Sequence, residues 1–335
     1  MKKNCLLICS ILTLSLLGMG CSKSGKIGQR STFSPPNGPM VLKIKWTKGE
    51  RIDQSMVLTQ TMVMTVPGVP TPMEQNTTMG QDFGFTVLDE TPDGKHEVEM
   101  DFLNAKMTSA MGGKTMVDYD SSKKAAAGAA PDPVGDLLGK VIGSKVQFYL
   151  DATNGVERIT GTDELTSRLS AGNQQDQLAM MRSMYSEGYL KQTMSAYQIL
   201  SPNPVQPGDT WPVHFEFTMD KIGTLIVDNT FTFQNWEIHG KRYCARLEFQ
   251  GTIKSSENAD IDPKGMSFKI LDGTASGSSW FDPELGVTLD TTMNQTINSV
   301  ITVPKPGGRP GDAGQTLSIP AQMTQSYIVK LNSVK

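Results

Sequence analysis

The chain contains three histidines, His96, His214 and His239, and histidine is the side chain best suited to move a proton at neutral pH. A metal site would need further His, Cys or carboxylate ligands at spacings such as HxxxH or CxxC. None of the three histidines has such a neighbour in the sequence. His96 and His239 fall at or beside expected turns, and His214 falls in an expected strand next to Pro212. We therefore interpret them as exposed or edge residues and predict no metal site.

A search for a nucleophile gives one weak candidate. Residues 273–279, GTASGSS, place serines among glycines, but the segment lacks the GxSxG pattern of a nucleophile elbow and leads into an expected strand. We interpret it as a flexible hairpin connection, with an active-site loop as the alternative. The sequence has neither GxGxxG nor a P-loop motif. We therefore predict no cofactor, no catalytic residue and no enzymatic activity.

Four aspartates occur in patterns that could carry chemistry or structure. Asp118 and Asp120 are two positions apart, so on a strand they share one face and could bind a cation or act as an acid–base pair. A solvated strand face is the interpretation that we favour. Asp151 and Asp282 each precede a turn that contains Gly-Val. Since aspartate side chains accept hydrogen bonds from turn backbones, we expect these two to stabilise turns.

The chain is rich in methionine, with 20 residues. Met62 and Met64 stand in TMVMTV, residues 61–66, and would share one face of a strand. Thioether sulfur is a soft ligand that can bind Cu(I), but methionine also fills irregular cores and adaptable binding surfaces. We favour core packing for Met62 and Met64, with an apolar-ligand surface and a copper site as alternatives.

The first residues have the features of an export signal. Two lysines precede an apolar run from Leu6 to Leu17, and small or flexible residues follow it. The run is shorter than the roughly 20 apolar residues that a membrane span needs. We predict a signal peptide over residues 1–20, which takes no part in the fold.

Residues 16–21, LLGMGC, resemble a bacterial lipobox, whose cysteine is acylated and becomes the first residue of the mature protein. That motif usually has Leu where Gly18 stands, so ordinary cleavage nearby and a soluble secreted product are the alternative. Several acyl chains on Cys21 would hold firmly to a membrane, since each buried CH₂ contributes about 0.8 kcal/mol. Ser22, in place of Asp, resembles the signal for sorting to the outer membrane, facing the periplasm. We predict a lipid-anchored envelope protein, with the membrane as a partner through Cys21.

Composition limits the remaining possibilities. Residues 21–39 are rich in Ser, Gly, Pro and Lys, so we predict a flexible tether. A net charge of −3 provides no basic field, so nucleic acid is not expected as a partner. Cys5 and Cys9 leave with the leader and Cys21 carries lipid, so Cys244 has no partner for an internal disulfide. We expect Cys244 to be structural, with a reactive thiol as the alternative.

Two segments share one β pattern. Residues 85–107, FTVLDETPDGKHEVEMDFLNAKM, and residues 231–253, FTFQNWEIHGKRYCARLEFQGTI, align without a gap. Each has Phe-Thr, an apolar residue, a polar turn with Gly-Lys and a long alternating segment, which is typical of a β-hairpin. We predict two related β units, 40–161 and 201–335, with chance similarity between amphipathic hairpins as the alternative.

The alternation also predicts how the strands face. Val98, Met100 and Phe102 share one face, and acidic residues occupy the other, as in an antiparallel sheet that is wet on one side. The apolar side of such a sheet must be covered. We predict a mainly β protein of the α+β class, with two similar curved antiparallel sheets, each covered by helices, and a helical segment at 162–200 between them.

Helices and loops are expected around these strands. A short helix is predicted at 132–142. Another is predicted from Thr162, where a capping residue and two first-turn acids precede Leu165 and Leu169 at helical spacing. A third helical run, from Asp176, places one stripe on a common face: Leu178, Met181, Tyr185 and Tyr189. Residues 67–80 and 304–316 are rich in Pro, Gly or polar residues and are expected to be loops.

Several motifs together resemble a known group of proteins. They are the leader with Cys21, KWTKGER, EVEMDF, LLGKVIGSKVQFYLDATNGVERITG, VQPGDTWPV and SSWFDPELGV. With these the chain is similar to a bacterial lipoprotein family defined as a domain of unknown function, which implies an architecture but no catalytic residues. A looser likeness, at the level of the fold, is to lipoprotein-carrier-like proteins, in which a curved antiparallel sheet clasps a helix around an apolar groove.

These observations favour a non-catalytic binding or structural module of the cell envelope. One hypothesis is a scaffold that binds another envelope protein through exposed edges and loops. The other is a carrier of an apolar ligand held between sheet and helix. A pocket of roughly 300–1,000 Å³ would favour the carrier, and a filled interior would favour the scaffold.

Overall fold

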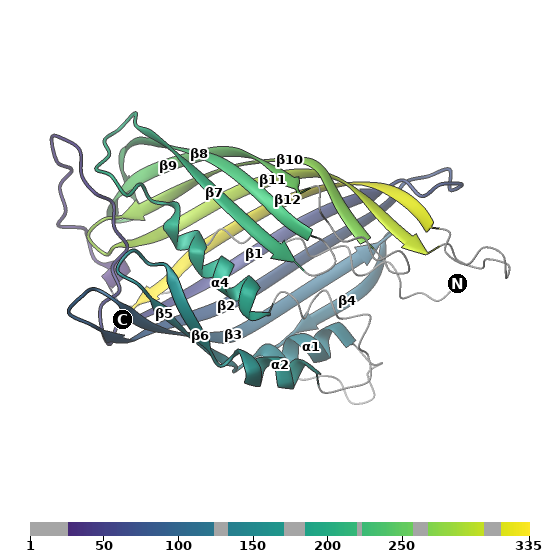
Figure 1. Cartoon of the computed structure of the whole chain (residues 1–335), viewed down its shortest axis with the longest axis horizontal. Coiled ribbons are helices and arrows are strands. Elements are labelled where there is room, and N and C mark those ends of the chain that lie inside the picture. Colours follow the sequence, from purple (N-terminus) through teal and green to yellow (C-terminus); the bar gives the residue numbers. More distant parts are fainter. Residues whose placement is uncertain (1–25, 124–132, 171–184, 220–222, 257–266, 305–315) are drawn as a thin grey trace.

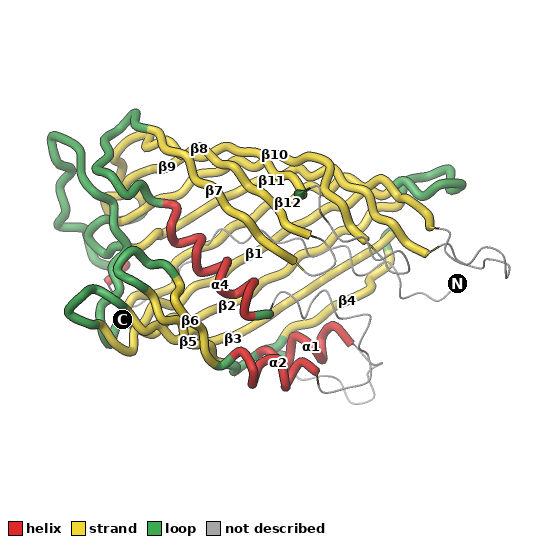
Figure 2. The backbone as a smooth tube through the Cα atoms, viewed as in Figure 1, coloured by secondary structure: helices red, strands yellow, loops and turns green. Residues whose placement is uncertain are grey.

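The computed structural model describes residues 26–123, 133–170, 185–219, 223–256, 267–304 and 316–335, and a 12-stranded sheet makes up most of them (Figures 1 and 2). The expected signal peptide and Cys21 lie outside the described residues, so both stay predictions. Among the described residues, no helix combines the length and the apolar character needed to cross a bilayer.

The first half of the chain forms long strands because polar and apolar residues alternate along it. In β1, buried side chains occupy every second position, as the period of a strand requires. The strands of this half are β1 (Arg51–Met64), β2 (Met73–Glu90), β3 (His96–Met111), β4 (Lys114–Asp120), β5 (Lys145–Leu150) and β6 (Val156–Thr160).

The second half continues in the same way. The expected hairpin around Gly240 is present, since His239 pairs with Arg242 across the turn between β8 and β9. The strands of this half are β7 (Thr210–Met219), β8 (Gly223–His239), β9 (Arg242–Ser255), β10 (Ser267–Asp282), β11 (Val287–Pro304) and β12 (Thr316–Val334).

All of these strands belong to one antiparallel sheet. Their spatial order is β6-β5-β3-β2-β1-β12-β11-β10-β9-β8-β7, and β4 pairs with β3 off this path. The expectation of two sheets, each covered by helices, is therefore wrong. The strands of the predicted units, 40–161 and 201–335, lie side by side in the one sheet, and the internal repeat stays a prediction.

The two halves join where β1 pairs with β12. The ladder runs from Ile52 opposite Val334 to Met64 opposite Ala321, with a register shift near its start. In the middle of the ladder, the side chain of Gln60 accepts a hydrogen bond from that of Gln325, which is 265 positions away in the sequence. Local hydrophobic patterns carry no information on a pairing at that separation, which is why they suggested two sheets.

Two helices lie against the β3 and β4 side of the sheet. α1 (Pro133–Val141) and α2 (Thr162–Ser170) contact each other, and α1 contacts β3 and β4 (Figure 1). Both confirm the helices expected at 132–142 and from Thr162. Their buried residues on the shared core are Val134, Leu137, Leu138, Val141, Leu165 and Leu169.

A third helix lies between the two ends of the sheet. α4 (Glu187–Ser195), continued by the 3₁₀ turn η3 (Ala196–Ile199), contacts both β6 and β7, which are the terminal strands of the sheet order (Figure 1). Leu190 and Met194 of α4 are buried. Of the stripe expected from Asp176, Leu178 and Met181 lie outside the described residues. We call the face of the sheet toward α4 the inner face.

Two segments expected to be connections are parts of strands. β2 begins at Met73, so residues 73–80 are part of a strand and not a loop. Their polar residues suggested a loop, but Gln75 and Thr77 are buried in the sheet. Residues 273–279 lie inside β10, which pairs with β9 and β11, so the expected hairpin connection is wrong. The small residues there serve close packing.

The described part of the expected tether lies against the folded chain. The hydroxyls of Ser31 and Thr32 each donate to the carboxylate of Glu284 at 2.6 Å. The Phe33 ring lies 5.3 Å from that of Trp236, measured between centroids. The Glu284 carboxylate at the β10–β11 turn is thus one of several groups that hold the segment before β1, beside the bonds from Lys26 to Glu50 and from Lys241 to Gly28.

Gly277 is one of the small residues of β10 that allow close packing against the neighbouring strands. A Cβ added there would come within 2.5 Å of the Phe249 ring and closer still to the carbonyl oxygen of Thr292, whereas at Gly80 in β2 it would meet ordinary contacts at 3.9 Å. We expect Gly277→Ala to lower the free energy of unfolding by about 1–3 kcal/mol, as overpacking does. Denaturant unfolding checks this, with Gly80→Ala as control; equal stability of the two variants would contradict the strand assignment of 273–279.

Acid should release the segment held by Glu284. Hydrogen bonds from Ser31 and Thr32 lower the pKa of Glu284 to about 2. Because the folded pKa lies below the ordinary value, this stabilisation is present above about pH 4.5 and is lost as the pH falls through about 2.

We expect Glu284→Gln at pH 7 to lower the hydrogen-exchange protection of the Thr32 and Phe33 amides, as acid does in the wild type. Both amides donate to the Glu284 carboxylate. Glu157→Gln, which removes an exposed ion pair with Lys95, is the control and should leave this protection unchanged. Unaltered protection in Glu284→Gln would show that the carboxylate does not hold the segment.

Candidate functional site

A row of polar side chains crosses the inner face in the middle of the sheet. Strand pairing aligns it from β3 through β2, β1, β12 and β11 to β8, with two small residues in β10 and β9. We call it the polar row: Ser109, Thr77, Gln60, Gln325, Gln295, Ala275, Gly251 and Asn229. Each polar member is buried, with at most 3% of its surface exposed.

The polar row satisfies its own hydrogen-bonding groups only in part. Gln325 Nε2 donates to Gln60 Oε1 at 2.7 Å, and the hydroxyls of Thr77 and Ser109 lie 3.0 Å apart. Within the described structure, Gln60 Nε2, Gln295 Oε1 and both side-chain polar atoms of Asn229 have no partner. A buried polar atom without a hydrogen bond costs about 1–3 kcal/mol, so these atoms favour a bound polar group.

Apolar residues flank the polar row on both sides. One neighbouring row contains Met79, Leu58, Tyr327, Met293, Phe249 and Phe231, and the other contains Met62, Met323, Ile297, Ile253 and Val227. All of these are buried. The prediction that Met62 and Met64 face the core is confirmed. Gln295 Nε2 donates to the sulfur of Met293 at 3.4 Å, which is a weak acceptor.

Tyr185, two residues before the start of α4, closes one part of the inner face. The Tyr185 ring lies edge-on to Phe102 of β3, with 5.8 Å between centroids, and its hydroxyl bonds the Gln81 side chain of β2. Burial raises the pKa of Tyr185 to about 12, so the phenol stays neutral. Although Gln81 bonds Tyr185, its Nε2 atom has no hydrogen-bond partner among the described residues.

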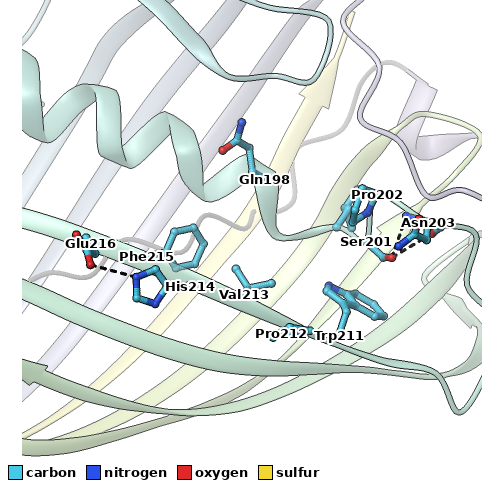
Figure 3. A pocket seen from close by; sticks show the side chains of 11 residues that line it. Gln198, Ser201, Pro202, Asn203, Trp211, Pro212, Val213, His214, Phe215 and Glu216 are labelled. Atoms are coloured by element: carbon cyan, nitrogen blue, oxygen red, sulfur yellow. Dashed lines mark hydrogen bonds and ion pairs between the residues drawn. The ribbon is translucent and has the colours of Figure 1, made fainter.

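A pocket of about 570 Å³ lies where the segment after α4 meets the terminal strand β7 (Figure 3). Its lining residues are Gln198, Leu200, Ser201, Pro202, Asn203 and the β7 residues from Trp211 to Glu216. Trp211 Nε1 donates to the carbonyl of Ile199 at 2.8 Å and ties the two walls together. Val213 pairs with Asn229, so the pocket adjoins the end of the polar row.

The three histidines are far from forming one centre. His214 lies on the exposed side of the pocket beside Glu216 (Figure 3). Hydrogen bonds to Asp228 at 2.7 Å and to Glu216 at 3.3 Å raise its pKa. His239 stacks on Trp280 and contacts Asp290 at 3.2 Å. Partial burial lowers the pKa of His96. The interpretation as exposed or edge residues fits His214 on the terminal strand β7, whereas His96 and His239 are partly buried on strands that have a neighbour on each side.

The expected roles of the aspartates agree with the contacts. Asp151 Oδ1 accepts the amides of Thr153 and Gly155, and Asp282 Oδ1 accepts those of Glu284 and Leu285, so the turn prediction is confirmed for both. Asp118 and Asp120 lie on β4.

A hydrogen bond from the Ser122 hydroxyl lowers the pKa of Asp120 to about 2, so this carboxyl is ionised at neutral pH and has no proton to donate.

Charge is buried away from the polar row. The guanidinium of Arg242 is 4% exposed and donates to Asp282 at 2.6 Å and to Glu284 at 3.0 Å. Cys244, next to it on β9, is fully buried, and burial raises its thiol pKa, so it fits the structural role expected for it. No cluster of three or more His, Cys, Asp or Glu side chains that could hold a metal ion occurs in the part of the chain described.

Sequence reasoning missed the polar row, although β1 contains a signal for it. In RIDQSMVLTQTMVM, the glutamines Gln54 and Gln60 fall in phase with the buried Met56, Leu58 and Met62. A polar residue in phase with the apolar positions of a strand indicates a buried polar group, so this phase is the signal in the sequence that could have found the polar row.

Comparisons with known structures give likenesses of low score. Lipovitellin, described for its lipid–protein interactions, matches with 10% identity over 87% of this chain and 26% of its own, with a TM-score of 0.45. An exported protein with a YmcC-like fold from Bacteroides fragilis matches with 11% identity over 88% of this chain and all of its own, with a TM-score of 0.24.

The outer membrane protein OprG from Pseudomonas aeruginosa matches with 6% identity over 87% of this chain and 97% of its own, with a TM-score of 0.25. Because the lipovitellin match covers 26% of that chain, this chain spans only about a quarter of lipovitellin. At TM-scores below 0.5, none of these likenesses carries weight for function.

The sequence comparisons are more decisive. No curated protein matches the chain. A family model described as a family of unknown function (DUF6263) matches residues 93–288, which is more than half of the 335 residues. The chain therefore belongs to the family of unknown function DUF6263.

Proposed function

We propose that this chain is a lipid-anchored, non-catalytic envelope protein that binds an apolar or amphipathic ligand between the inner face of its sheet and α4. The observation that carries the proposal is the pocket of about 570 Å³ between β7 and the segment that follows α4. Its volume falls in the range of roughly 300–1,000 Å³ that small-molecule sites occupy.

The position of the pocket supports a route to the inner face. β7 is the last strand in the sheet order and pairs with β8 alone among the described strands. Trp211, Val213 and Phe215 alternate along β7 and line the pocket, and Trp211 and Phe215 are buried in the same core as the inner-face residues of β8. A ligand that enters beside β7 would therefore meet the inner face directly.

The mixed lining favours an amphipathic ligand over a purely apolar one. Trp211, Val213 and Phe215 provide apolar surface, whereas His214 and Glu216 lie on the exposed side. Ordered backbone near Ser201, whose hydroxyl donates to the carbonyl of Asn203 at 3.1 Å, shapes the opposite wall. None of these contacts resembles a catalytic pair that holds a nucleophile against its base.

The anchor is the second part of the proposal. It is supported by the leader and by LLGMGC at residues 16–21, where Cys21 would carry the acyl chains. Two or more chains are needed for stable attachment, since one acyl chain binds a membrane only weakly. A location at the outer membrane, facing the periplasm, follows from Ser22 and is part of the same proposal.

Blocking the pocket should remove the ligand. We expect native mass spectrometry of the wild type, purified from its own envelope, to show a bound lipid or other apolar molecule. Val213→Trp should fill the pocket and reduce the affinity about tenfold, or about 1.4 kcal/mol. Thr324→Trp on the outer side of β12 is the control, because Thr324 is exposed and its strand does not line the pocket. Wild-type protein without any ligand, or equal occupancy in all three proteins, would argue against binding at this pocket.

Removal of the acylated sulfur should release the protein from the membrane. We expect Cys21→Ala to shift the mature protein from the membrane to the soluble fraction and to remove the mass of the acyl chains. Cys244→Ala, at a buried structural position, is the control for loss of a cysteine as such. A Cys21→Ala protein that stays wholly with membranes and keeps the wild-type modification mass would refute the anchor.

A further inference from the structure

The inner face around the polar row is free of charged residues. The polar row and the apolar rows beside it contain amides, hydroxyls, thioethers and hydrocarbon side chains only, as the pairing of the described strands shows. A well-buried ion pair, Arg242 with Asp282, is satisfied at the β10–β11 turn. A ligand carboxylate or phosphate placed at the polar row would have no counter-charge, which strongly disfavours its burial.

The polar row offers donors and acceptors that need neutral partners. Gln60 Nε2 can donate, Gln295 Oε1 can accept, and Asn229 has both an unpartnered donor and an unpartnered acceptor among the described residues. An acyl carbonyl accepts from such amides, and a hydroxyl or amide N–H donates to them. The free atoms therefore match an ester or amide that carries a neighbouring hydroxyl or N–H.

The small residues of the row explain how Asn229 reaches across the sheet. Its side-chain oxygen lies over Gly251 of β9, where any Cβ would overlap it. The next member of the row is Ala275, which is also small, and Gln295 follows. Asn229 of β8 and Gln295 of β11, the two side chains with unpartnered atoms here, thus flank the small residues of β9 and β10.

Apolar surface for a hydrocarbon chain lies on both sides of this polar centre. Met293 and Leu58 belong to one flanking row, and Met62, Met323 and Ile297 belong to the other. Methionine side chains adapt to ligands of different shape, as in other binding surfaces that use them. A molecule with an uncharged polar centre and an acyl chain fits this order of polar and apolar rows.

We propose that the polar row hydrogen-bonds the uncharged ester or amide group of a bound acyl lipid, with the acyl chain lying on a flanking apolar row. This inference rests on the proposed ligand-binding function and names the class of ligand: a neutral acyl lipid, in preference to a fatty acid anion or a hydrocarbon. The selectivity comes from Gln60, Gln295 and Asn229.

The test compares three probes with the same chain length. Monopalmitin carries an uncharged ester and hydroxyls, palmitate carries a carboxylate, and hexadecane has no polar group. Each is delivered from cyclodextrin to the full-length acylated protein in nanodiscs, at pH 8, and protein-bound probe is measured by native mass spectrometry. We expect monopalmitin to bind about tenfold more tightly than either of the other two, in line with one or two net hydrogen bonds.

Two variants remove the proposed contacts while keeping side-chain volume. Gln295→Met and Asn229→Leu should abolish the preference for monopalmitin and leave hexadecane binding unchanged. Gln322→Met, an exposed glutamine on the outer side of β12, is the matched control and should keep the preference. Denaturant unfolding of each variant checks that it folds, and Asn229→Leu serves alone if Gln295→Met does not.

The outcomes separate this inference from the proposed function. If no probe binds the wild type, the proposed function fails. If monopalmitin and hexadecane bind equally, or if Gln295→Met and Asn229→Leu keep the wild-type preference, apolar binding stands and the role of the polar row is refuted. Tighter binding of palmitate than of monopalmitin would likewise overturn the inference, because it would require a charge partner at the site.

Discussion

The hydrogen-bonded ladder between β1 and β12 is the constraint on which the rest of this structure depends. It joins the first long strand of the fold to the last and makes one sheet of two halves that are otherwise built from local hairpins. Because side chains alternate between faces, the register of this ladder decides which residues of both strands face inward. A slip by one position would expose Met62 and Met323 and bury their polar neighbours. The same register brings Gln60 and Gln325 together.

That register also creates a chemical pattern that neither half has alone. Ser109, Thr77 and Gln60 come from the first half of the chain, and Gln325, Gln295 and Asn229 come from the second. Only when β1 and β12 pair do they form one line across the sheet. The polar row lowers the stability of the fold, since several of its buried polar atoms have no hydrogen-bond partner among the described residues. Proteins keep such groups where a ligand or a function compensates for them, so the polar row links the fold to the proposed binding role.

The helices and the charged groups limit where a ligand can approach. α4 lies between the terminal strands β6 and β7, and the pocket opens beside it at β7. Charged contacts that organise the fold lie toward the turns, as with Arg242, Asp282 and Glu284, which also hold Ser31 and Thr32. The centre of the inner face is left neutral. This separation of charge from the proposed binding surface is the electrostatic basis for expecting a neutral ligand.

The sequence by itself determined the parts of the structure that rest on local chemistry. Alternation predicted the inward face of Val98, Met100 and Phe102, which are buried. The sequence also predicted α1 at 132–142, and capping and leucine spacing predicted α2. The turns at Asp151 and Asp282 followed from the way aspartate bonds a nearby backbone.

Only the tertiary structure decided the pairing of β1 with β12, the strand nature of 73–80 and 273–279, and the existence of the polar row. The reason is physical: β pairing over 265 residues leaves no local trace, and a buried glutamine such as Gln75 resembles a loop residue until its neighbours across the sheet are known.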